Sequence, residues 1–290
     1  MFFKSFVGRV YTKSNNKKRD FDMSGASWSG EIAAAVAPGF PTPFVGIVGM
    51  AAVFCGFLVG LSKAGLPGAG IVVVPIMAGI MPARESVGFL LPILIVGDVF
   101  AIVYWRRHVD WRQLFRLFPC TFLGVGGGYF ALRAITSRQL LPVIGAIVLS
   151  MIALKWWNSA RAEKGIEIPR SLWLASVTGT VAGATSMMAN AAGPIIVIYL
   201  LSMGMEKRNL IGTSAWFFFV LNLFKTPFGG NLDLITMESL KANCLFVPVI
   251  LIGGICGVFL AQRIPQKQFN LVVELIAAGT ALCLCVKGLM

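Results

Sequence analysis

Long apolar stretches alternate with short polar connections along almost the whole chain. Most of them approach the roughly 20 residues that a helix needs to cross the hydrocarbon core of a bilayer. Backbone polar groups in lipid must find partners within the chain, so even the β-branched run Val72, Val73 and Val74 is expected to be helical. The pattern predicts ten membrane segments, over residues 42–61, 66–82, 86–105, 113–133, 139–157, 171–188, 191–204, 209–228, 239–262 and 267–288.

Composition supports the same class. Of the 290 residues, 57% are apolar and 13% are charged, with a mean hydropathy of +0.81. Soluble domains carry roughly 25% charged residues, so lipid must cover much of the apolar surface. The predicted fold is therefore an all-α polytopic membrane protein, with no room between its segments for a soluble domain.

Two halves of the chain carry similar residues in the same order. The matched pairs are Gly68 with Gly193, Gly79 with Gly204, Asp98 with Asn222, Asp110 with Asp233, and Gly128 with Gly257. This indicates an N-terminal extension over 1–41, a first repeat over 42–158, a basic linker over 159–170 and a second repeat over 171–290. Five segments in each half would place the second repeat upside down, as in many secondary transporters.

Basic residues suggest the orientation in a bacterial inner membrane. Lys and Arg gather in loops that fall on one side of the ten-segment arrangement, including Arg106 and Arg107, and this side should be cytoplasmic. The basic residues before residue 20 conflict with that orientation. Translation from Met23 would remove the conflict, whereas a basic arm bound to anionic lipid headgroups is the alternative.

Segments 2 and 7 are the shortest, and Gly and Pro interrupt them at matching positions. Such segments are expected to be broken or re-entrant, and in transporters they mark the binding site. A new helix beginning at each break would direct free N–H groups towards an anion. Close helix packing by small residues is the alternative. The candidate site residues are Gly65, Pro67, Gly68 and Gly70 in the first break and Asn190, Gly193 and Pro194 in the second.

Ionisable side chains within the predicted spans are costly in lipid and usually have a role. Lys63 lies at the first break, and Lys225 follows an aromatic run in segment 8, so both are candidates for binding an anion. Asp98 and Glu274 are candidates for carrying a coupling proton. Both lysines could instead extend to the interface, Asp98 could form a structural pair with a lysine, and Glu274 could lie near the headgroups.

Other functional classes find little support in the sequence. The six cysteines lack metal-ligand spacing, and His108 lies in a basic loop, so no metal or cofactor is expected. No hydrolase, metalloprotease or phosphate-loop motif is present, which argues against an enzyme. The basic residues lie on one membrane face, so nucleic acid is not an expected partner despite the pI of about 9.9.

Several stretches resemble the sulfite exporter TauE/SafE family, also called the TSUP permeases, from about Pro43 to the C-terminus. They are residues 60–68 (GLSKAGLPG), 91–98 (LPILIVGD), 104–111 (YWRRHVDW), 192–194 (AGP) and 222–225 (NLFK). The resemblance implies two repeated membrane halves and transport of sulfite, sulfoacetate or related organosulfur anions, often outwards. It supports Lys63, residues 65–70, Asp98, Gly193 and Lys225 as site residues. Pro67 and Ala69 depart from the family's three glycines, which leaves the substrate open.

The sequence thus predicts a secondary transporter of a small anion, with its binding site at the two breaks. A passive anion channel, or a non-transport membrane enzyme or assembly factor, are the alternatives. The expected partners are the anion and the lipid bilayer, and a homo-oligomer is compatible with the sequence.

Overall fold

The structure is a computed structural model that describes residues 47–65, 69–163, 171–235, 237–263 and 266–289. Within these ranges the chain is helical and contains no strand. The elements are α3 (Ile47–Ala64), the 3₁₀ helix η1 (Ala69–Val72), α4 (Val73–Ile80), α5 (Ala83–Trp105), α6 (Trp111–Ala134), α7 (Ser137–Glu163), α8 (Leu172–Ala189), α9 (Gly193–Ser202), α10 (Lys207–Asn231), α11 (Met237–Arg263) and α12 (Gln266–Leu289).

The ten predicted segments each correspond to a helix, with η1 and α4 together forming the second. The N-terminal extension, Met23 and residues 42–46 lie outside the described residues. Of the predicted linker, residues 159–163 belong to α7, and 164–170 are not described. The division into two repeats at those residues stays a prediction.

Side chains set the ends of several helices. The Asp110 carboxylate accepts hydrogen bonds from the backbone N–H groups of Arg112 and Gln113, at 3.0 and 3.3 Å, and so begins α6. Ser171 begins α8 in the same way, accepting from the N–H of Leu174 at 3.2 Å. Asp110 in the Arg-Arg-His-Val-Asp-Trp stretch therefore has a structural role as a helix cap.

Within the described residues, four helices are long and apolar enough, by length and composition, to cross a membrane. These spans are Ala83–Trp105, Ser137–Trp157, Leu172–Ala189 and Ser239–Leu260. Shorter apolar helices accompany them, and the outer surface carries large apolar side chains, such as Leu123 at 74% exposure and Trp173 at 77%. Apolar surface of this extent would be costly in water, so the chain is a multi-pass membrane protein.

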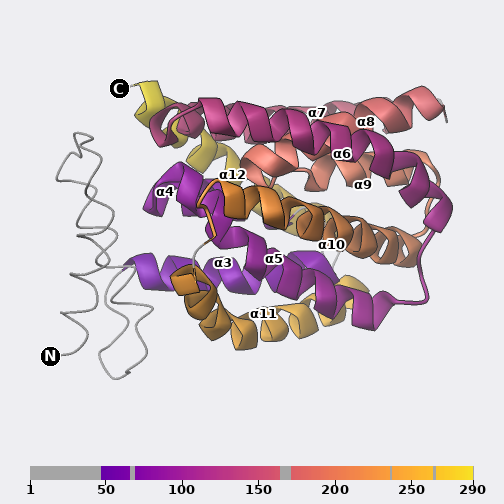
Figure 1. Cartoon of the computed structure of the whole chain (residues 1–290). Coiled ribbons are helices and arrows are strands. Elements are labelled where there is room, and N and C mark those ends of the chain that lie inside the picture. The colour runs from indigo at the N-terminus through magenta and orange to yellow at the C-terminus, as the bar shows by residue number, and fades with distance from the viewer. Residues whose placement is uncertain (1–46, 66–68, 164–170, 236, 264–265, 290) are drawn as a thin grey trace, which may run out of the picture.

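The two halves pack against each other through matching pairs of helices. α3 lies along α11 and α8 lies along α6, on opposite sides of the bundle (Figure 1). α5 packs on α10, α7 packs on α12, and the short helices α4 and α9 contact α12 and α7 respectively. If α3 to α7 are exchanged in order for α8 to α12, each contact in this set becomes another contact of the same set. A two-fold relation between the halves would produce this exchange of contacts.

Glycine permits the closest of these contacts. A Cβ atom on Gly183 of α8 would collide with the backbone carbonyl of Thr121 in α6, and one on Gly60 of α3 would collide with that of Ile250 in α11. Small residues in membrane helices allow backbones to approach in this manner. The glycines of α3, α6, α8 and α11 at these contacts therefore serve helix packing.

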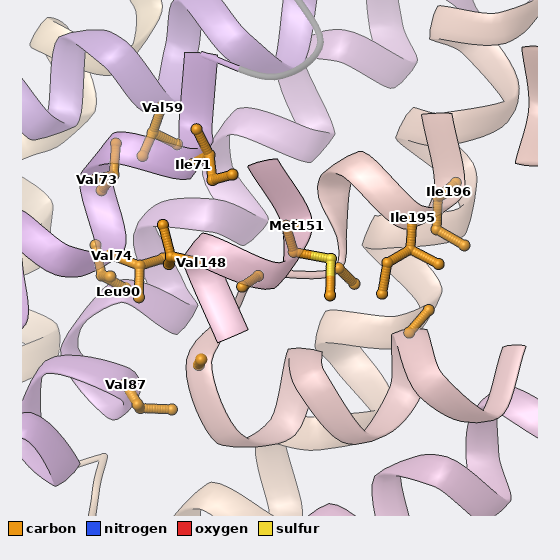
Figure 2. Close-up of a cluster of buried hydrophobic side chains, with 14 of the residues drawn as sticks. Val59, Ile71, Val73, Val74, Val87, Leu90, Val148, Met151, Ile195 and Ile196 are labelled. Atoms are coloured by element: carbon orange, nitrogen blue, oxygen red, sulfur yellow. The ribbon is translucent and has the colours of Figure 1, made fainter. Parts of the chain in front are cut away.

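An apolar core lies between the two short helices. Figure 2 shows Val73 and Val74 of α4, Val148 and Met151 of α7 and Ile195 and Ile196 of α9 directed into this region. All six side chains are buried. The core therefore joins the two helix breaks through α7.

Replacing Gly183 with alanine should destabilise the α6–α8 contact, because the new methyl group meets a backbone carbonyl that cannot rotate away. Overpacking of this kind costs about 1–3 kcal/mol. We expect a lower melting temperature in detergent for Gly183→Ala.

Gly126→Ala in α6 is the matched control, since a Cβ atom at Gly126 meets nothing within 4 Å. This variant should melt at or slightly above the wild-type temperature, because alanine is the better helix former. Equal melting temperatures for the two variants would contradict the packing role of Gly183.

Candidate functional site

Both predicted breaks are present in the helices. α3 ends at Ala64, and after Gly65 the described chain resumes at Ala69 with η1 and the 8-residue α4. α8 ends at Ala189, and the 10-residue α9 begins at Gly193. Neither α4 nor α9 approaches the roughly 20 residues of a full span. Segments 2 and 7 are therefore short and discontinuous with the helices before them.

Polar contacts shape the chain at each break. In the first, the backbone N–H of Gly70 donates to the Ser62 hydroxyl oxygen at 3.0 Å, which ties the start of η1 to the end of α3. In the second, Asn190 adopts the left-handed conformation with φ of 51°, which ends α8 and redirects the chain. Asparagine tolerates this conformation better than most residues.

A cavity of about 80 Å³ lies between the two breaks. A single buried water needs roughly 10–15 Å³ on this measure, so the cavity can hold several waters or a small ion. α3, η1, α4, α5, α8, α9 and α10 all contribute to its wall. The polar or glycine lining residues are Ser62, Lys63, Gly70, Ser186, Asn190, Gly193, Ser214 and Asn222.

Lys63 forms an ion pair with Asp98 beside this cavity. The Lys63 Nζ lies 2.7 Å from Oδ1 of Asp98, which is fully buried, while the lysine side chain retains 13% exposure. Asn222 of α10 donates from Nδ2 to the other carboxylate oxygen at 2.7 Å. The pair is buried and hydrogen-bonded, as a charge within a membrane protein requires.

The environment of Lys63 directs its ammonium group towards the cavity. The Lys63 Nζ also lies over the ring of Phe218, 4.1 Å from the centroid, and both residues line the cavity. Gly97, next to Asp98, leaves space for the lysine stem, since a Cβ there would lie 3.2 Å from Lys63 Cγ. Lys63 can therefore face an occupant of the cavity while it remains paired with Asp98.

Lys225 is buried behind the second break, with 2% exposure. Its Nζ donates to the Ser186 carbonyl at 3.0 Å, the Ser186 hydroxyl at 2.9 Å and the Asn190 side-chain oxygen at 2.7 Å. These three acceptors match the three donors of an ammonium group. They also lie at the C-terminal end of α8, where the helix dipole favours a cation.

Asn190 links three helices at this point. Its side-chain oxygen accepts from Lys225 of α10, and its Nδ2 donates to the Val87 carbonyl of α5 at 3.0 Å. Because Asn190 also ends α8 and lines the cavity, its amide positions the wall of the cavity relative to the buried lysine.

The free end of α9 completes the lining. Gly193 and Pro194, its first residues, face the cavity, and a Cβ on Gly193 would meet nothing within 4 Å. The Tyr199 hydroxyl donates to Gln113 of α6 at 2.8 Å and holds α9 in place. N–H groups at a helix start favour an anion, so this end of the cavity is suited to a negative charge.

The structure places the residues predicted for the site differently. Lys63, Gly70, Asn190, Gly193 and Pro194 line the cavity, whereas Asp98 and Lys225 contact lining residues from behind.

Gly65 lies apart from the cavity lining and packs against the backbone of Gly257 in α11, which is the helix-packing alternative weighed for the glycines. Pro67 and Gly68 lie outside the described residues. Glu274 belongs to α12, but its side chain lies outside the described ones.

Several lining residues were not among the predicted site residues. Ser62, Ser186, Ser214 and Phe218 lie within apolar runs, where single hydroxyl or aromatic groups carry no distinctive spacing. Asn222 is the position matched to Asp98 in the second half of the chain, and this match could have identified it as a site residue. No cluster of three potential metal ligands occurs within the described part of the chain.

Comparison with known proteins adds one family. The profile of the family described as sulfite exporter TauE/SafE matches residues 52–284, which is most of the chain and includes both breaks and the cavity between them. Neither a curated protein nor a solved structure matches significantly. On the strength of this match, the chain belongs to the sulfite exporter TauE/SafE family of membrane transporters.

Proposed function

We propose that the chain is a secondary transporter that binds a small oxyanion, such as sulfite, sulfoacetate or another organosulfonate, in the cavity between the two breaks. The observation that carries this proposal is an excess of buried positive charge. Two lysines, Lys63 and Lys225, lie around the cavity with one carboxylate, Asp98. Among the described residues, no carboxylate lies within ion-pair distance of Lys225.

Charge balance explains why an anion is the favoured occupant. An uncompensated charge in a medium of low dielectric constant carries a high solvation cost. Neutral acceptors reduce this cost at Lys225, but the formal charge of the cluster is +1 when both lysines are protonated. An anion in the cavity would neutralise it, with Lys63 and the start of α9 as its direct contacts.

The cavity also offers polar groups for the oxygens of the anion. Ser214 lines the cavity, and its buried hydroxyl has no hydrogen-bond partner within the described part of the chain. Ser186 and Asn190 present further polar atoms in the same wall. A ligand with several oxygen acceptors, such as a sulfite or sulfonate group, suits this set better than a carboxylate or halide.

Alternating access would operate through the apolar wall of the cavity. Val73, Val74 and Leu90 line it and are at most 3% exposed, so packed side chains bound the cavity on this side. A passive channel would need a continuous polar path, whereas an alternating carrier needs a packed layer that opens on one side at a time. Movement of one repeat against the other, in a bacterial inner membrane, is the mechanism we propose.

Removing the excess charge should weaken anion binding. In Lys225→Met the cluster becomes neutral, so the affinity for a stabilising anion should fall at least about tenfold. The measurement is the melting temperature in detergent with sulfite, sulfoacetate, taurine, sulfate, acetate or lactate. An anion at 100 times its Kd stabilises a reversibly unfolding protein by about 2.7 kcal/mol.

Lys287→Met, which removes an exposed lysine near the end of α12, is the matched control and should keep the wild-type response. An unchanged anion response in Lys225→Met would show that the buried charge does not attract the anion. The absence of any response from the wild-type protein would contradict the anion site altogether.

Asp98→Asn should separate proton coupling from binding. The amide cannot carry a proton in exchange with solvent, but it retains the shape of the carboxylate between Lys63 and Asn222. We expect reconstituted vesicles to lose flux driven by a pH gradient while anion exchange at equal pH continues. Undiminished pH-driven flux in Asp98→Asn would exclude Asp98 as the coupling group. For the wild-type protein, flux that neither saturates with anion concentration nor responds to the pH gradient would indicate a channel.

Ser214→Ala should weaken binding of the preferred anion at least about tenfold, because a hydrogen bond to a charged group typically contributes 1.5–3 kcal/mol. The buried hydroxyl has no other partner in the described chain, so the folded protein should lose little stability. Titration of the melting temperature with anion tests this. Ser202→Ala at the end of α9 is the matched control, because its hydroxyl lies outside the cavity lining. Thr213→Ala would be unsuitable, since the Thr213 hydroxyl accepts from the backbone N–H of Asp110 in the α5–α6 connection. Equal affinities in Ser214→Ala and wild type would remove Ser214 from the site.

A further inference from the structure

A second hollow lies on the outer surface, where α5 ends and turns towards α6. Its volume is about 470 Å³. Three residues of α5, Phe100, Val103 and Tyr104, form its apolar part, and the following residues Arg106, Arg107 and His108 form its basic part. We call this hollow the α5 groove. It is separate from the cavity between the breaks, with which it shares no lining residue.

Among the described residues, no carboxylate forms an ion pair with Arg106 or Arg107, which are both exposed. The nearest acidic residue in sequence, Asp110, directs its carboxylate to backbone N–H groups at the start of α6. Nδ1 of His108 is buried and has no hydrogen-bond partner in the described structure. The groove therefore presents positive charge and an unused polar atom.

Contacts with neighbouring helices hold this basic segment in place. The backbone N–H of His108 donates to the Trp105 carbonyl at 2.8 Å, and the two rings meet edge to face at 5.8 Å. The N–H of Asp110 donates to the Thr213 hydroxyl of α10 at 2.9 Å. Gly212 permits close approach of the His108 carbonyl to α10. Groups fixed before binding lose less entropy when a ligand arrives.

The apolar part of the α5 groove continues onto a surface suited to lipid. Val103 is 67% exposed and Tyr104 is 50% exposed, on a helix that is long and apolar enough to span the bilayer. An aromatic residue beside arginines at the end of such a helix is typical of the membrane interface. The groove thus joins a cationic end at the interface to an apolar end that continues along the helix.

We propose that the α5 groove binds an anionic phospholipid, with its phosphate between Arg106 and Arg107 and an acyl chain along Phe100 and Val103. Guanidinium groups bind phosphate oxygens through paired hydrogen bonds. Basic pockets on the cytoplasmic side of membrane proteins bind acidic headgroups in this way. The loop charges predict that this end of α5 is cytoplasmic, and the proposal is independent of the transported substrate.

Native mass spectrometry of the purified full-length protein, titrated with phosphatidylglycerol or phosphatidylcholine of the same acyl chains, tests the proposal. We expect phosphatidylglycerol to bind at least about tenfold more tightly, because each basic residue near an anionic lipid contributes on this scale. In Arg106→Gln/Arg107→Gln the two lipids should bind equally. Both side chains are exposed, so the double variant should fold normally, which its melting temperature checks.

Arg112→Gln/Arg208→Gln is the matched control, because it removes two exposed arginines from the same predicted face without altering the groove lining. This control should keep the preference for phosphatidylglycerol. Excess glycerol phosphate should fail to displace phosphatidylglycerol, because the acyl chain contributes to binding. Displacement of the lipid would overturn the proposal in favour of a site for free phosphate groups. Equal binding of both lipids to the wild type, or an unchanged preference in Arg106→Gln/Arg107→Gln, would also overturn the proposal.

Discussion

Burying charge inside a membrane is the constraint on which the arrangement of this protein depends. Two lysines and an aspartate lie among helices whose buried side chains are mostly apolar. The two lysines meet this cost by different means. Lys63 has a carboxylate partner, whereas Lys225 has only neutral oxygens at the C-terminal end of α8. These oxygens belong to Ser186 and Asn190, in the last turn and at the C-terminal cap of α8.

The breaks and the charges therefore depend on each other. The Ser186 carbonyl accepts from the backbone N–H of Asn190 at 3.0 Å as well as from Lys225, so the last hydrogen bond of α8 and the buried lysine share one acceptor. Conversely, a break without polar side chains nearby would expose backbone groups to an apolar interior. The left-handed Asn190 serves both needs, since it ends the helix and its side chain joins Lys225 to the Val87 carbonyl. The cavity is the space that remains between two such helix ends.

The relation between the two halves explains how this charge distribution arises. Asp98 and Asn222 are matched positions in the sequence, and in the structure they form a hydrogen bond with each other at 2.7 Å. Matched residues meet directly when they lie close to a two-fold axis. The symmetry is not complete, because one member is a carboxylate and the other a neutral amide. This difference leaves the cluster with more positive than negative charge, which is the property that suits an anion.

The end of α3 also connects the cavity to the cytoplasmic-facing connection predicted between α5 and α6. Trp105 donates from its ring nitrogen to the Ala64 carbonyl at 2.8 Å, next to Lys63, and its ring contacts His108. The same connection begins α6 through Asp110 and contacts α10 through Thr213. A movement of this connection would alter contacts both at the cavity and at the surface, because the hydrogen bonds of Trp105 and Thr213 are buried or partly buried.

The amino-acid pattern alone predicts the class, the ten helices and the places where two of them break. Apolar length and the absence of water as a hydrogen-bond partner leave helices as the main solution, and Gly, Pro and Asn at the breaks act through local backbone geometry. The pattern also identifies Lys63, Asp98 and Lys225 as costly residues, since burial of a charge is evident from its apolar neighbours. Which of these residues pair depends on the packing of the helices. Lys63 and Asp98 are separated by a helix break, and Lys225 reaches Ser186 from a different helix. The local sequence pattern therefore cannot predict these contacts. For the same reason the sequence could not distinguish Gly65, which packs on Gly257, from Gly193, which faces the cavity. A glycine has the same local effect on the backbone in a tight helix contact as it has beside a ligand.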